Sequence, residues 1–107
     1  MYANMKYILD AANRDNYAVM AINCINMEMA RAAIEAAEEE HSPIIVQFGV
    51  GQMAKMAHPT EMVPMIKAMA ERVTVPVCLN LDHGPSFEAE TDAIRWGFSN
   101  VVCVCVS

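Results

Sequence analysis

The chain has 107 residues, of which 55% are hydrophobic, and a formal net charge of -6. This composition is typical of one globular domain or part of one, and it excludes a disordered chain. The negative charge argues against a nucleic-acid partner, because proteins that bind phosphate backbones carry basic patches. The longest apolar runs, such as 101–106, are far shorter than the roughly 20 residues of a membrane span, and the polar N-terminus lacks a signal-peptide pattern. We therefore expect a cytoplasmic protein with no membrane partner.

Hydrophobic periodicity predicts an amphipathic helix over residues 3–14, which should lie across one end of the fold. The apolar run 17–24 predicts the first strand, with Asn23 at its carboxyl end. Asn26 is then expected to cap a second helix. That helix ends in the acidic run 38–40, which we interpret as a solvent-exposed face.

The second strand is predicted at 44–48, where Gln47 is the one polar residue. The Gly-x-Gly that follows at 49–51 could cradle a phosphate, but the fuller dinucleotide-binding pattern is absent, which favours a tight turn. Residues 53–58 are expected to be irregular. Thr60 is expected to cap the next helix, in which methionines occupy core-facing positions.

The third strand begins near Val75 and ends abruptly in Asp82-His83-Gly84, at the end of a parallel strand where α/β folds keep their chemistry. Neighbouring residues of an extended strand point to opposite sides, so a turn at Gly84 is needed before Asp82 and His83 can share one pocket. Ser86 is expected to cap the helix that follows and ends at Gly97. From these residues alone, His83 is either a metal ligand or a hydrogen-bonded structural histidine.

A fourth strand is predicted at 100–106, which completes a series of βα units of regular length. Short connections and right-handed crossovers allow either a doubly wound open sheet or an arc of a (β/α)8 barrel. The four cysteines lie in strand-like runs, which favours buried reduced thiols over disulfides. A zinc or redox site at Cys103 and Cys105 is the alternative.

The triplet Asp82-His83-Gly84, with Leu79-x-Leu81 before it and Ser86-Phe87-Glu88 after it, resembles the class II aldolase family, which includes the fructose- and tagatose-bisphosphate aldolases. The resemblance implies an α/β fold, the first half of a (β/α)8 TIM barrel with an N-terminal helix and four parallel βα strands, as one partial domain over residues 1–107. It extends over further segments of the chain: Asn4-Met5-Lys6, Tyr17-Ala18-Val19, Asn23, Asn26, 35–39, 42–45 and Gly97-Phe98.

The resemblance also implies a reaction, the zinc-dependent and reversible cleavage of fructose 1,6-bisphosphate or tagatose 1,6-bisphosphate to dihydroxyacetone phosphate and glyceraldehyde 3-phosphate. In that reading His83 is a ligand of Zn²⁺ and Asp82 transfers the proton at the aldehyde oxygen. Asn23, Gln47 and Gly49 would face the phosphorylated ketose, with Gly49 standing where relatives often carry Ser.

In the family, two further zinc-binding histidines and the phosphate-binding loops lie on later strands, and Val104 stands where an acidic residue is expected. The alternative function is therefore a truncated, catalytically inactive remnant that self-associates. A more distant alternative is a small flavodoxin-like binding domain. Because a four-strand arc leaves two strand edges unpaired, we expect a homo-oligomer.

Overall fold

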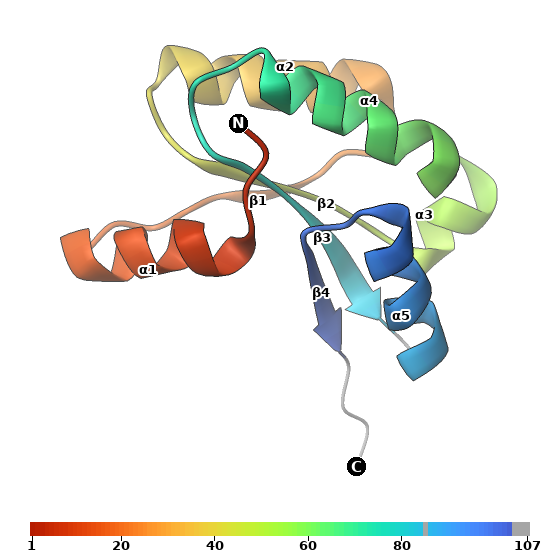
Figure 1. Ribbon diagram of the computed structural model, residues 1–107. Coiled ribbons are helices and arrows are strands. Elements are labelled where there is room, and N and C mark those ends of the chain that lie inside the picture. Colours follow the sequence, from red (N-terminus) through yellow and green to blue (C-terminus); the bar gives the residue numbers. More distant parts are fainter. Residues whose placement is uncertain (85, 104–107) are drawn as a thin grey trace.

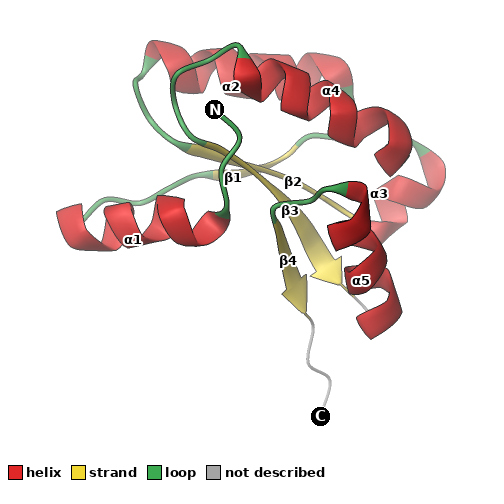
Figure 2. Ribbon diagram, viewed as in Figure 1, coloured by secondary structure: helices red, strands yellow, loops and turns green. Residues whose placement is uncertain are grey.

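The computed structural model describes residues 1–84 and 86–103, so the predicted continuation of the fourth strand through Val104–Val106 lies outside the described residues. Helices and strands alternate along the chain (Figures 1 and 2). None of the described helices has the length and apolarity needed to cross a membrane. The elements are α1 (Met5–Asp15), β1 (Ala21–Asn23), α2 (Met27–Glu39), β2 (Ile44–Gly49), α3 (Val50–Lys55), α4 (Pro59–Glu71), β3 (Val77–Gly84), α5 (Phe87–Trp96) and β4 (Asn100–Cys103).

The four strands form one parallel sheet in the order β1-β2-β3-β4. Each successive strand of the chain therefore pairs with the strand before it, at the same edge of the sheet. In a doubly wound sheet, the strand order instead reverses at a switch point. The fold is α/β, as predicted, and is consistent with the first half of a TIM barrel. It also argues against the flavodoxin-like alternative, whose strand order begins 2-1-3.

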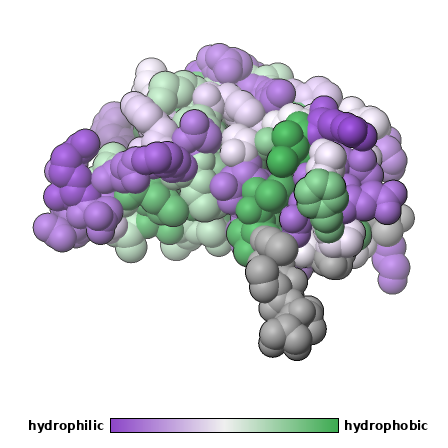
Figure 3. All heavy atoms as spheres, turned by 60° about the horizontal axis from the view of Figure 1, so that its bottom comes forward, coloured by the Kyte–Doolittle hydropathy of each residue, from purple (hydrophilic) through white to green (hydrophobic). Residues whose placement is uncertain are grey.

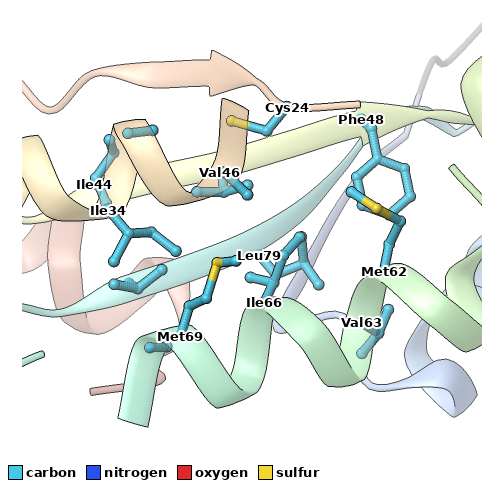
Figure 4. Close-up of a cluster of buried hydrophobic side chains, with 14 of the residues drawn as sticks. Cys24, Ile34, Ile44, Val46, Phe48, Met62, Val63, Ile66, Met69 and Leu79 are labelled. Atoms are coloured by element: carbon cyan, nitrogen blue, oxygen red, sulfur yellow. The ribbon is translucent and has the colours of Figure 1, made fainter. Parts of the chain in front are cut away.

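One face of the sheet is covered by α2 and α4, which lie side by side above it in Figure 1. The strands contribute Val46, Phe48 and Leu79 to this face, and α4 contributes Ile66; all four side chains are fully buried (Figure 4). Phe48 also packs on the ring of Phe98, with the ring centroids 5.0 Å apart. Full burial of one such side chain is worth about 1.5–3 kcal/mol, so most of the folding free energy resides here.

On the other face, α1 covers only the first residues of the strands (Figure 1). Its Ile8 packs against Ile45 and Cys78, which are register partners on β2 and β3. The strand positions beyond them are not covered by α1. The predicted helix across one end of the fold is thus present, and it leaves the carboxyl half of this face for polar side chains.

The first strand is shorter than predicted, because only Ala21–Asn23 of the run 17–24 pairs with β2. Helix α1 ends at Asp15, and the left-handed conformation of the capping residue Asn16 redirects the chain. Residues 17–20 then approach β2 through one hydrogen bond, from Ile45 N to the Met20 carbonyl. An edge strand has a partner on one side only, so hydrophobicity alone overestimates its length.

Two further predictions are corrected between β2 and α4. Residues expected to be irregular belong in part to α3, which begins because the side chain of Gln52 accepts a hydrogen bond from Gly49 N at 2.8 Å. Helix α4 begins at Pro59, one residue before the predicted cap Thr60, and His58 caps it by accepting from Thr60 N. His58 is exposed and lies in the loop before α4, and its side chain also caps that helix.

The acidic run at the end of α2 is also more than a solvent-exposed face. Both carboxylate oxygens of Glu38 accept hydrogen bonds from the loop before β3: from Thr74 N at 2.9 Å, Val75 N at 3.1 Å and Thr74 Oγ1 at 2.9 Å. The Val75 backbone bond and the Thr74 hydroxyl hold the pKa of Glu38 below its ordinary value. Glu38 therefore ties α2 to the entrance of β3.

The described cysteine thiols are buried and free at Cys24 and Cys78, which confirms that prediction for these two. Burial raises the pKa of Cys24 to about 11 and also raises the pKa of Cys78. A buried thiol with a raised pKa is a poor nucleophile, because the thiolate is the reactive form. The alternative site at Cys103 and Cys105 extends beyond the described residues.

Candidate active site

Asp82 and His83 end β3, as predicted from the apolar run that precedes them. His83 adopts φ of 54°, a left-handed conformation that few residues other than glycine adopt. This backbone turn brings the two side chains together, so that His83 Nε2 lies 3.5 Å from Asp82 Oδ2. The turn was predicted at Gly84, but His83 itself makes it, and the pairing with β4 shifts register between Leu81 and Gly84.

Gly84 is needed for a different reason, which is a close approach of neighbouring groups. A Cβ at this position would lie 2.9 Å from the Val102 carbonyl oxygen and 2.8 Å from Cγ of Glu90. Glu90, on α5, places its Oε1 in a buried position where no described residue offers it a hydrogen bond. Nothing in the sequence distinguishes Glu90 from Glu88, which lies two positions earlier on the same helix.

A row of four amide side chains crosses the sheet, one from each strand. Asn23, Gln47, Asn80 and Asn100 are register partners from β1 to β4. Gln47 Nε2 donates to Asn23 Oδ1 at 3.1 Å, Asn80 Nδ2 donates to Gln47 Oε1 at 3.1 Å, and Asn100 Nδ2 donates to Asn80 Oδ1 at 2.8 Å. We call these four residues the amide row.

The amide row and Asp82 lie on the same face of the sheet. Residues two apart in a strand point to the same side, which groups Asn80 with Asp82 and Gln47 with Gly49. Gly49 is the register partner of Asp82, and a Cβ on Gly49 would lie 3.2 Å from the Asp82 carbonyl oxygen. The predicted site residues therefore gather on one face at the carboxyl ends of neighbouring strands.

Asn23 and Gln47 were predicted from the sequence as substrate-facing residues, whereas Asn80 and Asn100 were not. Asn80 is the buried polar side chain of the described core, with 2% of its surface exposed. Asn80 could have been predicted from the sequence, because it is a polar residue inside an apolar strand. It lies two positions before Asp82 and therefore on the same face of the sheet. Asn100 had no comparable signal, because its link to Asn80 depends on the register between β3 and β4.

The described residues do not by themselves form a zinc site. They contain no group of three or more His, Cys, Asp or Glu side chains able to hold a metal ion. His58 caps α4, and His41 lies in the turn after α2, so neither joins His83. A catalytic zinc usually has three protein ligands, and His83 can supply one of them.

The groups at the carboxyl ends of the strands differ in exposure. Asp82 is half-buried and can accept or return a proton, while the imidazole of His83 is largely exposed to solvent. At the exposed end of the amide row, Asn23 supplies an amide group able to hydrogen-bond to an oxygen of a bound molecule. A carboxylate beside an imidazole at the end of a parallel strand is an arrangement suited to general acid–base chemistry.

Residues 3–104 match the family model described as "Fructose-bisphosphate aldolase class-II". The chain is 42% identical over 101 residues to a probable fructose-bisphosphate aldolase of Bacillus subtilis, which covers 92% of this chain and 35% of that protein. It is 39% identical over 104 residues to the fructose-bisphosphate aldolase of Mycoplasma pneumoniae, covering 95% and 36%. The crystal structure of the YdjI aldolase from Escherichia coli K12 superposes with a TM-score of 0.87 at 35% identity, covering 94% of this chain and 38% of that one.

This chain belongs to the class II fructose-bisphosphate aldolase family, as its third strand and the segments around it predicted. It spans little more than a third of the length of the relatives that it matches. The match runs over all four strands, so the face that carries Asp82 and the amide row belongs to the shared part of the fold.

Proposed function

We propose that this chain carries one half of the active site of a class II ketose-bisphosphate aldolase, which cleaves fructose 1,6-bisphosphate to dihydroxyacetone phosphate and glyceraldehyde 3-phosphate. The observation that carries the proposal is the pairing of Asp82 with His83 at the carboxyl end of β3, on a chain whose relatives are named for this reaction. Tagatose 1,6-bisphosphate is the second candidate substrate, because it differs from the first only in the configuration of one carbon.

Each described side chain has a role in the proposed reaction. Asp82 takes the proton of the C4 hydroxyl as the C3–C4 bond breaks, and returns it in the reverse direction. Asn23 and Gln47 hold oxygens of the ketose by hydrogen bonds. Gly49 lies beside Asp82 and would face the ketose through its backbone, because it has no side chain to offer.

The family implies zinc, and His83 would be one of its ligands. Zinc in such an enzyme acts as a Lewis acid that polarises a carbonyl group. Since the described residues hold no complete ligand set, the roles given above are limited to what Asp82 and the amide side chains do. The buried thiols of Cys24 and Cys78 fit the reducing cytoplasm predicted from the sequence.

The test joins this chain to the remaining segment of the Bacillus subtilis relative, beginning after the aligned region, and measures cleavage of fructose 1,6-bisphosphate together with zinc content. Asp82→Ala should lower kcat by about 10²–10⁴-fold with zinc retained, since that is the range of general acid–base catalysis. His83→Ala should lower zinc content as well as turnover. Asp92→Ala, on the exposed surface of α5, is the matched control. Full activity in either site variant would contradict the role assignments.

We also propose that the chain self-associates through its strand edges. β1 and β4 are the outer strands of the described sheet. Large hydrophobic side chains lie exposed nearby, with Met20 65% exposed, Ile94 61% and Val102 40%. Figure 3 shows hydrophobic surface among hydrophilic residues on the side of the molecule turned forward. Unprotected edges of this kind promote pairing between chains.

Sedimentation under reducing conditions tests the assembly. A homodimer or larger species is expected, and a sharp monomer of 11.8 kDa with cooperative unfolding would contradict it. The alternative of an inactive remnant gains no support from the relatives reported above, which are named as aldolases or probable aldolases.

A further inference from the structure

The hydrogen bonds of the amide row all run in one direction. Each amide nitrogen donates to the carbonyl oxygen of the next side chain, from Asn100 to Asn80, from Asn80 to Gln47 and from Gln47 to Asn23. An amide side chain can be rotated to exchange its oxygen and nitrogen, so the same row could in principle run the opposite way. Something must select the direction.

The selecting group is the backbone carbonyl of Val101. Asn100 Nδ2 donates to this carbonyl oxygen at 3.3 Å, in addition to its bond with Asn80. A carbonyl oxygen can only accept, so the nitrogen of Asn100 must face it. In the reversed row, the oxygen of Asn100 would lie beside the Val101 oxygen, and the two would repel.

Asn80 transmits the direction, because it is buried and uses both ends of its amide. Its Oδ1 accepts from Asn100 and its Nδ2 donates to Gln47. With 2% of its surface exposed, Asn80 cannot exchange either bond for water. A buried amide that loses its partner costs about 1–3 kcal/mol, so the row reverses as a unit or not at all.

The row ends at Asn23, which is exposed on β1. Its Oδ1 is occupied by Gln47, and among the described residues none accepts a hydrogen bond from its Nδ2. We propose that the amide row fixes Asn23 as a hydrogen-bond donor toward an oxygen of the sugar phosphate, and that Asn100 and Asn80 are positioning residues that act through Gln47. This inference rests on the proposed function and adds to it two residues with no contact to the substrate.

The first test needs no ligand. In the ¹⁵N-labelled chain, hydrogen exchange of the side-chain NH2 groups should be slow for Gln47, Asn80 and Asn100 and fast for Asn23. Asn100→Asp removes the donor and supplies an acceptor of the same shape, which should reverse the row. Exchange at the Asn23 NH2 should then slow by about fivefold, the factor that corresponds to one net hydrogen bond.

Two further variants make this test decisive. Asn13→Asp, on the exposed surface of α1, is the matched control and should leave Asn23 unchanged. Asn100→Ala removes the selecting contact without supplying an acceptor, and it replaces the Asp variant if that one does not fold. Both directions should then be populated, so exchange at Asn23 should slow by a smaller factor. Unchanged exchange at Asn23 in the folded Asn100 variants would overturn the amide row as a relay.

The second test asks what the relay does, with fructose 1,6-bisphosphate as the probe and calorimetry as the readout. Reversal in Asn100→Asp turns Asn23 into an acceptor, so the sugar phosphate should bind about fivefold or more weakly than to the unaltered chain. Equal affinity would overturn the donor role of Asn23. If the unaltered chain does not bind the probe while exchange behaves as described, the relay stands and the donor role of Asn23 fails; the proposed function fails separately, if the chain joined to the remaining segment of the relative shows no turnover.

Discussion

The two faces of the four-stranded sheet carry different kinds of side chain, although they alternate along the same strands. The face under α2 and α4 is uniformly apolar and closely packed. The opposite face changes along the strands, from Ile45 and Cys78 under α1, through the amide row, to Asp82. One face therefore supplies the folding free energy, and the other can carry polar groups whose arrangement is set by chemistry.

Removal of a large side chain from the packed face should have the largest effect on stability. Phe48→Ala deletes a fully buried ring that contacts Phe98, and it should destabilise the chain by about 3–5 kcal/mol. Asp82→Ala, from the same sheet but the other face, should change stability far less. Urea unfolding measures both, and equal losses would mean that the faces do not divide their roles.

Substitutions in the amide row should cost less stability than Phe48→Ala and more than Asp82→Ala. Asn80→Ala leaves Gln47 and Asn100 without their shared partner, at a cost of about 1–3 kcal/mol. The exposed Asn13→Ala on α1 controls for the loss of an amide and should be nearly neutral. If Asn80→Ala is also neutral, the buried amide is not held by its neighbours.

A substitution at His83 should raise the stability of the chain, because the left-handed backbone of this residue carries strain. That conformation costs a non-glycine residue about 1–2 kcal/mol. His83→Gly should therefore stabilise the chain by up to about 1 kcal/mol, after the greater flexibility of glycine in the unfolded state is counted. Thermal unfolding measures the change. A loss of stability would indicate that the imidazole supports the fold instead of serving the site.

The smallest expected effect concerns Glu38, at the rim of the packed face. Its pKa is lowered in the folded chain by hydrogen bonds from Val75 and Thr74. The stabilisation is therefore present above the unfolded-state pKa and lost as the pH falls through the lower folded pKa. Comparing unfolding of the unaltered chain and Glu38→Gln across this acidic range should give a smaller pH slope for the variant. Parallel curves would show that the bonds to Thr74 and Val75 contribute nothing.

The sequence predicted the parallel strands and the location of Asp82 and His83, because apolar runs ending in ionisable residues are a local signal. It did not predict the turn at His83, since a strained backbone conformation reflects its surroundings and not the residue itself. The extent of β1 and the start of α4 depended on pairing and on capping by His58, which composition does not encode. The amide row required the register of all four strands, information that no single segment contains.

The most direct test of the division between faces is a titration of the ¹⁵N-labelled chain with fructose 1,6-bisphosphate, followed through the backbone amide resonances. The predicted shifts lie at Asn23, at 47–49 and at 82–84, with α2 and α4 unaffected. Shifts centred on the groove between α2 and α4, which Arg31 and Arg72 line, would place the ligand on the face that we assign to folding alone. That result would contradict the assignment of ligand binding to the face that carries the amide row and Asp82.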